Sequence, residues 1–142
     1  MRVEDIRRIF IVGAGTMGQQ IALQCATHGL EVVVYDVSRE ALDSASARIA
    51  GYGAQLVSQA RLTPVQLQSA LPRISFSNRP EDAATADLLS ESVPEDPKLK
   101  AEVFARFNAV CPPHTVFTTN TSTLVPSMFA EATGRPGQFA AL

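Results

Sequence analysis

The sequence predicts an α/β fold in which helices cover both faces of a doubly wound parallel sheet. Short apolar runs without polar alternation, typical of strands buried on both faces, begin with I-F-I-V at 9–12 and V-V-V-Y at 32–35. Capped or amphipathic helical stretches separate these runs, and this alternation is typical of parallel strands joined by right-handed crossovers. Six predicted strands fit the order 3-2-1-4-5-6, in which a ligand binds at the carboxyl ends of the strands.

Composition limits the class of protein. The 142 residues fit one domain, and 46% hydrophobic with 18% charged residues is typical of a soluble globular protein. No apolar run approaches the roughly 20 residues of a membrane helix, and the acidic start does not resemble a signal peptide. Two cysteines, Cys25 and Cys111, form no disulfide framework and favour a reducing, cytoplasmic location. With a net charge of −2 and no basic cluster, we expect no nucleic-acid partner.

Three glycines directly follow the first strand (9–12) at G-x-G-x-x-G spacing: Gly13, Gly15 and Gly18. In a dinucleotide site of the Rossmann type, the first glycine permits the tight turn, the second lets the backbone approach a pyrophosphate, and the third lets the next helix pack closely on the sheet. The helix start then presents free N–H groups to the phosphates. We therefore predict that a pyrophosphate is held by Gly13, Ala14, Gly15, Thr16, Met17 and Gly18. A purely structural turn is the alternative.

The helix after this turn is expected from Gly15 to His28, ending at Gly29, a residue suited to a left-handed C-cap. We expect its inward face to contain Met17, Ile21, Ala22, Leu23 and Cys25. The second strand, 31–36, ends in Asp36, close to the distance of about 20 residues at which dinucleotide sites carry a ribose-binding acid.

Asp36 favours NAD over NADP, because a carboxylate accepts hydrogen bonds from both ribose hydroxyls but repels a 2′-phosphate. Arg39 is the counter-argument, since an arginine just past the second strand could pair with that phosphate. FAD and S-adenosylmethionine also use glycine-rich first turns and remain alternatives.

A helical insertion is predicted between the second and third strands. Ser38 caps a long helix that runs toward Ala60, and Gly51 and Gly53 predict a bend or break within it. A short helix then starts at Pro64, with proline at its first position.

The second half of the chain repeats the alternation. Strands are expected at 74–77, within 87–93, at 115–119 and at 138–142; helical segments are expected at 80–86, 96–110 and 125–132. The stripe of the 96–110 helix is predicted to contain Leu99, Val103, Phe107 and Val110, with Phe104 beside it. Polar groups follow the fourth and fifth strands at 91–95 and 120–123, the same carboxyl edge as the glycine turn.

The segment T-T-N-T-S-T-L at 118–124 has two interpretations. In the structural one, Ser122 or Thr123 caps the helix that Pro126 helps to start. Two histidines have no expected catalytic role: His114 precedes the fifth strand, at the wrong end of the sheet, and His28 favours the negative end of its helix.

Five segments are specific in their order and spacing: I-V-G-A-G-T-M-G (11–18), Y-D (35–36), E-S-V-P-E-D-P-K-L-K (91–100), T-N-T-S-T-L-V-P-S (119–127) and F-A-A-L (139–142). Together they resemble the NAD-binding domain of the 3-hydroxyacyl-CoA dehydrogenase family over essentially the whole chain. The resemblance implies that residues 13–18 hold the pyrophosphate and Asp36 the adenosine ribose. Glu95 and Lys100 match a glutamate and a lysine near the nicotinamide, although without the resemblance both would be interpreted as solvated charges at a helix start. Ser122 matches a serine that touches the nicotinamide ribose and the substrate 3-hydroxyl, and is the catalytic candidate here.

The implied reaction is hydride transfer between C3 of a 3-hydroxyacyl-CoA and C4 of the nicotinamide, in fatty acid metabolism. It needs a histidine base, which in the family follows a segment like 139–142. We therefore expect residues 1–142 to be the NAD-binding domain alone, inactive by itself and lacking the helical second domain that forms the homodimer in relatives.

The sequence departs from the family pattern at positions that concern the substrate. Relatives acting on CoA esters place a serine and a lysine where this chain has Tyr52 and Gln59, and only Arg48 and Arg61 are candidates for the CoA phosphates. A sister branch, which includes L-gulonate dehydrogenases and diketone reductases, acts on other 3-hydroxy or dicarbonyl compounds. A non-catalytic NAD-binding protein, like the lens crystallin related to this family, is a further alternative, as is another dehydrogenase with a similar first turn, such as the 6-phosphogluconate type.

Overall fold

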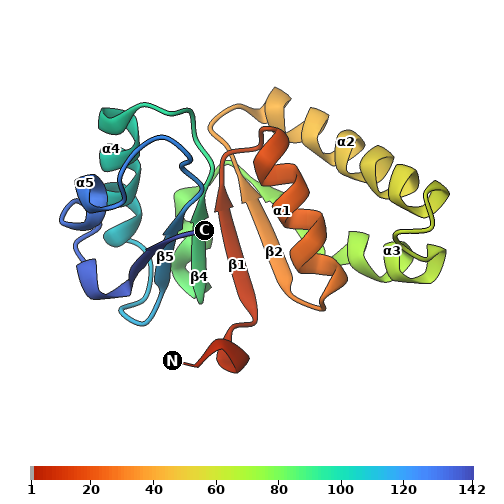
Figure 1. The fold of residues 1–142 in the computed structure, drawn as a ribbon, viewed down its shortest axis with the longest axis horizontal. Coiled ribbons are helices and arrows are strands. Elements are labelled where there is room, and N and C mark those ends of the chain that lie inside the picture. Colours follow the sequence, from red (N-terminus) through yellow and green to blue (C-terminus); the bar gives the residue numbers. More distant parts are fainter. Residues whose placement is uncertain (1) are drawn as a thin grey trace.

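The computed structural model describes residues 2–142 as a six-stranded parallel sheet with helices on both faces (Figure 1). The strands are β1 (Arg8–Val12), β2 (Glu31–Tyr35), β3 (Ile74–Ser77), β4 (Leu88–Glu91), β5 (Val116–Thr119) and β6 (Phe139–Ala141). Their order in the sheet is β3-β2-β1-β4-β5-β6, and every neighbouring pair is parallel. The predicted fold class and strand order are confirmed.

The helices divide between the two faces (Figure 1). One group consists of α1 (Thr16–Thr27), α2 (Arg39–Ser58) and α3 (Pro64–Ala70); the other consists of α4 (Pro97–Asn108) and α5 (Ser127–Ala130). Short 3-10 turns are η1 (Val3–Asp5), η2 (Leu71–Arg73), η3 (Pro80–Thr85) and η4 (Pro136–Gln138). No helix of residues 2–142 combines the length and apolar character needed to cross a membrane.

Strand β1 lies at the centre of the sheet and contributes side chains to the hydrophobic cores on both faces. Ile9 and Ile11 belong to the core under α1, α2 and α3, whereas Phe10 and Val12 belong to the core under α4 and α5. All four are at most 4% exposed. This alternation is the reason that the run 9–12 contains no polar residue, since both faces of the strand are buried.

The starts of α2 and α3 follow the predicted capping chemistry. Ser38 Oγ accepts a hydrogen bond from the Ala41 N–H (3.1 Å), and Thr63 and Gln66 form a reciprocal capping box at the start of α3. Gly29 has φ +84° after α1, as a left-handed C-cap requires.

The predicted break in α2 is wrong, because the helix runs without interruption from Arg39 to Ser58. Gly53 instead lets α3 approach: an added Cβ would collide with the Leu67 side chain. The predicted helix at 125–132 is reduced to the single turn of α5.

Two predicted inward faces also need correction. Met17 is 54% exposed rather than buried, and Gly18 and Gln19 are the buried residues of the same turn. Of the predicted stripe of α4, Phe107 and the adjacent Phe104 are buried, but Leu99 is 37% exposed, and the buried residues of the helix are Lys100, Phe104 and Phe107. A lysine therefore occupies a core position of α4.

Candidate dinucleotide site

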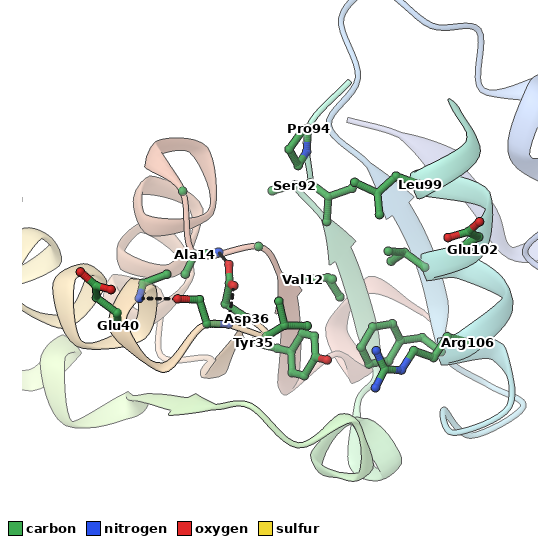
Figure 2. A pocket seen from close by; sticks show the side chains of 18 of the residues that line it. Val12, Ala14, Tyr35, Asp36, Glu40, Ser92, Pro94, Leu99, Glu102 and Arg106 are labelled. Atoms are coloured by element: carbon green, nitrogen blue, oxygen red, sulfur yellow. Dashed lines mark hydrogen bonds between the residues drawn. The ribbon is translucent and has the colours of Figure 1, made fainter. Parts of the chain in front are cut away.

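The carboxyl ends of β1, β2 and β4 border a cleft of about 980 Å³ (Figure 2). The register aligns the last residues of these strands, so the loops that follow them meet at one edge. In Figure 2, Ala14 and Asp36 lie on one side, and Leu99, Glu102 and Arg106 of α4 lie on the other. The lining also includes Val12, Gly13, Gly15, Tyr35, Val37, Ser38, Glu40, Ala41, Ser44, Arg48, Ser92, Val93, Pro94, Glu95, Val103 and Phe107.

The three glycines of the first turn differ in whether the protein itself leaves room for a side chain at that position. Gly13 has φ +115°, and an added Cβ would lie 2.6 Å from the Ser92 carbonyl oxygen. At Gly18 an added Cβ would overlap the Gly13 carbonyl oxygen, so this glycine allows α1 to pack on the turn. At Gly15, by contrast, no protein atom lies within 4 Å of an added Cβ. The protein itself therefore does not require a glycine at position 15, and a ligand that approaches the backbone would.

The start of α1 is open to an anion. Gly15 is the N-cap and provides no side-chain cap, and the first turn contains no acidic residue. The first N–H groups of a helix have no intrahelical acceptor, and the helix dipole places positive potential there. Thr16 and Met17 are exposed at this point, and buried Gln19 supports the turn by donating from Nε2 to the Ala14 carbonyl (2.8 Å). This geometry fits a pyrophosphate.

Asp36 is held in place by two backbone amides. Its Oδ2 accepts a hydrogen bond from the Ala14 N–H (3.1 Å) and its Oδ1 one from the Ser38 N–H (3.0 Å), as Figure 2 shows. Each oxygen keeps a lone pair for a further donor such as a ribose hydroxyl. Arg39 donates to Asn78 Oδ1 (3.2 Å) and does not line the cleft, which weakens the argument for a 2′-phosphate.

Glu91 is a buried acid that the sequence analysis did not identify as a separate site residue. It ends β4 with 0% exposure and accepts from the Val93 N–H (2.6 Å), Thr119 Oγ1 (2.6 Å) and Lys100 Nζ (2.8 and 2.9 Å). Lys100 Nζ also donates to the Val93 carbonyl (3.2 Å). The expectation of solvated charges is thus wrong for Lys100, which is 1% exposed and does not line the cleft.

Glu95 connects this buried pair to the cleft. Its Oε1 lies 3.1 Å from Lys100 Nζ, and its Oε2 accepts from Thr121 Oγ1 (2.6 Å) and Thr123 Oγ1 (2.8 Å). The two threonine hydroxyls, with Lys100, lower the pKa of Glu95 from 4.5 to about 2. Its carboxylate is therefore ionised at neutral pH, at the edge of the cleft.

Ser122 is exposed on the loop after β5, between the two threonines that bind Glu95. The predicted capping role is wrong for Ser122 and Thr123, because α5 begins only at Ser127 and it is Thr121 Oγ1 that accepts from the Leu124 N–H (3.0 Å). The Asn120 amide anchors this loop by donating to three acceptors on the β4 side, Ser90 Oγ, Glu91 O and Ser92 Oγ.

Other polar candidates lie away from the cleft. His114 Nε2 is 3.3 Å from Asp87 Oδ1, and Asp87 Oδ2 accepts from the Arg7 and Arg8 N–H groups at the beginning of β1, so this pair is at the amino edge of the sheet. His28 contacts the Gln24 carbonyl at the end of α1. Tyr52 and Arg61 line a separate cavity of about 100 Å³. Within residues 2–142 no His, Cys, Asp and Glu cluster is arranged to hold a metal ion.

Comparison with known proteins agrees with this geometry. The family model described as "3-hydroxyacyl-CoA dehydrogenase, NAD binding domain" matches residues 8–142. The 3-hydroxyadipyl-CoA dehydrogenase of Escherichia coli is 36% identical over 141 residues, which cover 97% of this chain and 29% of that protein.

Solved structures give the same result. A diketoreductase superposes with a TM-score of 0.90 at 37% identity, covering 96% of this chain and 49% of that one. The (S)-3-hydroxybutyryl-CoA dehydrogenase of Ralstonia eutropha gives 0.90 at 33% identity, covering 96% and 48%. The chain thus spans half or less of the length of these relatives. The chain belongs to the 3-hydroxyacyl-CoA dehydrogenase family, and the part of that family it matches is the NAD-binding domain.

Proposed function

We propose that this chain binds NAD across the cleft and provides the cofactor-binding part of an NAD-dependent 3-hydroxyacyl-CoA dehydrogenase. The observation that carries the proposal is the start of α1, where an uncapped helix meets open space at Gly15 beside the Asp36 carboxylate. Backbone N–H groups suit the pyrophosphate, and a carboxylate suits the two hydroxyls of an unphosphorylated ribose.

In this proposal residues 13–18 hold the pyrophosphate and Asp36 holds the adenosine ribose. Glu95, which lines the cleft, and Ser122, on the loop beside it, serve the nicotinamide half. Lys100 acts through Glu95, because its ammonium group is buried and its donors are already used.

When bound, NAD would accept the hydride that leaves the substrate carbon bearing the 3-hydroxyl group. The part of this chain is to orient the two reactants, with the Ser122 hydroxyl hydrogen-bonding the 3-hydroxyl group. A base must take the hydroxyl proton, and both histidines of this chain lie away from the cleft.

We propose that a histidine beyond residue 142 in the full-length enzyme is that base, and that the full-length enzyme is a cytoplasmic homodimer. The free Cys25 and Cys111 are consistent with a reducing compartment.

A second candidate is an NAD-dependent dehydrogenase of a non-CoA 3-hydroxy acid or a diketone. Tyr52 and Gln59 replace the CoA-contacting pair of the family resemblance, and the diketoreductase is a similar structure at 37% identity. Turnover by the full-length gene product separates the two: reduction of acetoacetyl-CoA with NADH supports the first, and turnover only of a free 3-oxo acid or diketone supports the second. Dinucleotide binding without turnover of any of these would indicate a non-catalytic binding protein.

The cofactor assignment is tested by titrating the chain with NADH and with NADPH while following nicotinamide fluorescence. We expect NADH to bind at least tenfold more tightly, about 1.4 kcal/mol. Equal affinities would show that Asp36 does not contact the ribose, and no binding of either would contradict the proposed function.

A further inference from the structure

A series of charged side chains runs from the end of β4 to the rim of the cleft. We define Glu91, Lys100 and Glu95 as the charge triad. Glu91 and Lys100 are buried, with 0% and 1% of their side chains exposed, whereas Glu95 is 39% exposed and lines the cleft. The ammonium group lies 2.8 Å from Glu91 Oε1 and 3.1 Å from Glu95 Oε1. Two carboxylates therefore share one cation, and the triad carries one net negative charge.

The three members have separable electrostatic roles. Lys100 fixes the position of Glu95, but in doing so it would also neutralise the only charge that the triad presents to the cleft. Glu91 offsets the lysine from the other side, where four hydrogen bonds and complete burial hold it. The arrangement thus holds the Glu95 carboxylate rigidly while leaving its negative charge uncancelled.

The triad also holds the loop that carries Ser122. Thr121 and Thr123 both donate to Glu95 Oε2, one on each side of Ser122. Thr119, at the end of β5, donates to Glu91 Oε2 (2.6 Å). The ends of β4 and β5 and the start of α4 are therefore connected through three charged groups.

This position identifies which half of a dinucleotide the charge would meet. In a doubly wound sheet each half binds one mononucleotide, and Asp36 on β2 marks the half that takes the adenosine. The triad lies in the other half, at β4 and β5. The nicotinamide ring would be the nearest group there, and it carries a positive charge when oxidised and none when reduced.

We propose that the charge triad makes this site favour the oxidised dinucleotide over the reduced one, with Glu95 facing the cofactor and Glu91 offsetting the charge of Lys100 without touching the cofactor. The inference rests on the proposed function, since it requires a dinucleotide whose nicotinamide lies in the β4–β5 half. Other charges near the start of α4, Asp96 and Lys98, are exposed and screened by water, and they are the same in every variant below.

The test is the ratio of NADH to NAD⁺ dissociation constants, measured by calorimetric titration of the chain and its variants. Glu95→Gln removes the net negative charge of the triad. The double variant Glu91→Gln/Lys100→Met removes a buried pair of opposite charges and keeps the net charge, and such replacements are often tolerated. Thr119→Val is the matched control, because it removes a hydrogen bond to Glu91 without any change of charge.

We expect Glu95→Gln to lower the ratio, so that preference for NAD⁺ declines by about fivefold to about thirtyfold. This range is the effect of one unit charge if it lies about 8 Å from the nicotinamide and the effective dielectric constant is about 20 to 40. The double variant and Thr119→Val should keep the ratio within about twofold of the unaltered chain. The single variant Glu91→Gln, which leaves a neutral Lys100–Glu95 pair, should lower the ratio as Glu95→Gln does, although Glu91 does not line the cleft.

A merely structural role would change thermal stability and both dissociation constants together, leaving the ratio unchanged in all variants, and that result would overturn the inference. A double variant whose ratio falls as in Glu95→Gln would overturn it too, and this comparison stands even if Glu91→Gln alone does not fold. If the unaltered chain binds neither NADH nor NAD⁺, that result would instead contradict the proposed function.

Discussion

Replacing Gly15 with alanine is expected to weaken dinucleotide binding while leaving the fold intact. No protein atom lies within 4 Å of the added Cβ, and φ at this position is −76°, which alanine adopts without strain. Because Gly15 is the N-cap of α1, where alanine is the poorer residue, the free energy of unfolding should fall by only about 0.5–1 kcal/mol. The methyl group would occupy the space in front of the first N–H groups of α1. We expect NADH to bind at least tenfold more weakly, which corresponds to about 1.4 kcal/mol.

Gly13→Ala is the matched comparison, since it adds the same methyl group two residues earlier. There φ is +115° and the new Cβ would lie 2.6 Å from the Ser92 carbonyl oxygen, so we expect a loss of about 2–4 kcal/mol in the free energy of unfolding. Urea unfolding followed by circular dichroism gives the stabilities, and NADH fluorescence gives the affinities. If Gly15→Ala binds NADH as the unaltered chain does, the pyrophosphate does not lie at this turn and the reasoning fails.

Three further predictions concern stability and are checked by urea unfolding. Gly51→Ala should raise the free energy of unfolding by about 0.5–1 kcal/mol, because position 51 is inside α2 and an added Cβ meets nothing within 4 Å; no change would mean that α2 is not helical at this point. Arg135→Ala should lower it by about 2–4 kcal/mol, since this partly buried guanidinium donates to Asn108 Oδ1 (2.9 Å) and to four backbone carbonyls and lies 4.4 Å from the Phe117 ring centroid; a loss below about 0.5 kcal/mol would contradict a stabilising role of this network. The lowered pKa of Glu95, about 2 against an ordinary 4.5, stabilises the fold fully above pH 4.5 and progressively less as the pH falls toward 2. The difference in free energy of unfolding between the unaltered chain and Glu95→Gln should therefore shrink between pH 4.5 and pH 2 and stay constant above pH 4.5.

The first half of the site was predictable because its signals are local in the sequence. The run 9–12 has no polar residue, and the glycine spacing follows it without interruption, so strand, turn and helix start could be assigned together. Asp36 followed from its place at the end of the next apolar run. What this reasoning could not provide is the reason for each glycine: only the three-dimensional structure separates Gly15, which faces open space, from Gly13 and Gly18, which face backbone.

The half of the site at β4 and β5 was harder to predict, because the contacts that hold it together join residues far apart in the sequence. Lys100 and Glu91 are nine positions apart, and Thr119 is 28 positions from Glu91. A lysine near a helix start is interpreted by default as solvated, yet Lys100 stands four positions before Phe104 and seven before Phe107, on the same buried stripe. That spacing was visible in the sequence, but a buried lysine becomes reasonable only when its acidic partner is known.

The two halves of the cleft should therefore respond differently to substitution. The proposed adenosine side depends on backbone groups, namely the N–H groups of residues 15–18 and the Ala14 amide that orients Asp36, so we expect an added Cβ to be more damaging there than most exchanges of side-chain chemistry. The proposed nicotinamide side depends on side chains that hold one another, from Thr119 through the charge triad to Thr121 and Thr123. On this side, substitutions that change a charge, and not those that add a Cβ beside the backbone, should alter the preference between the oxidised and the reduced dinucleotide. Related chains that keep the glycine turn but lose one member of the triad should accordingly still bind a dinucleotide, with a changed preference for its oxidation state.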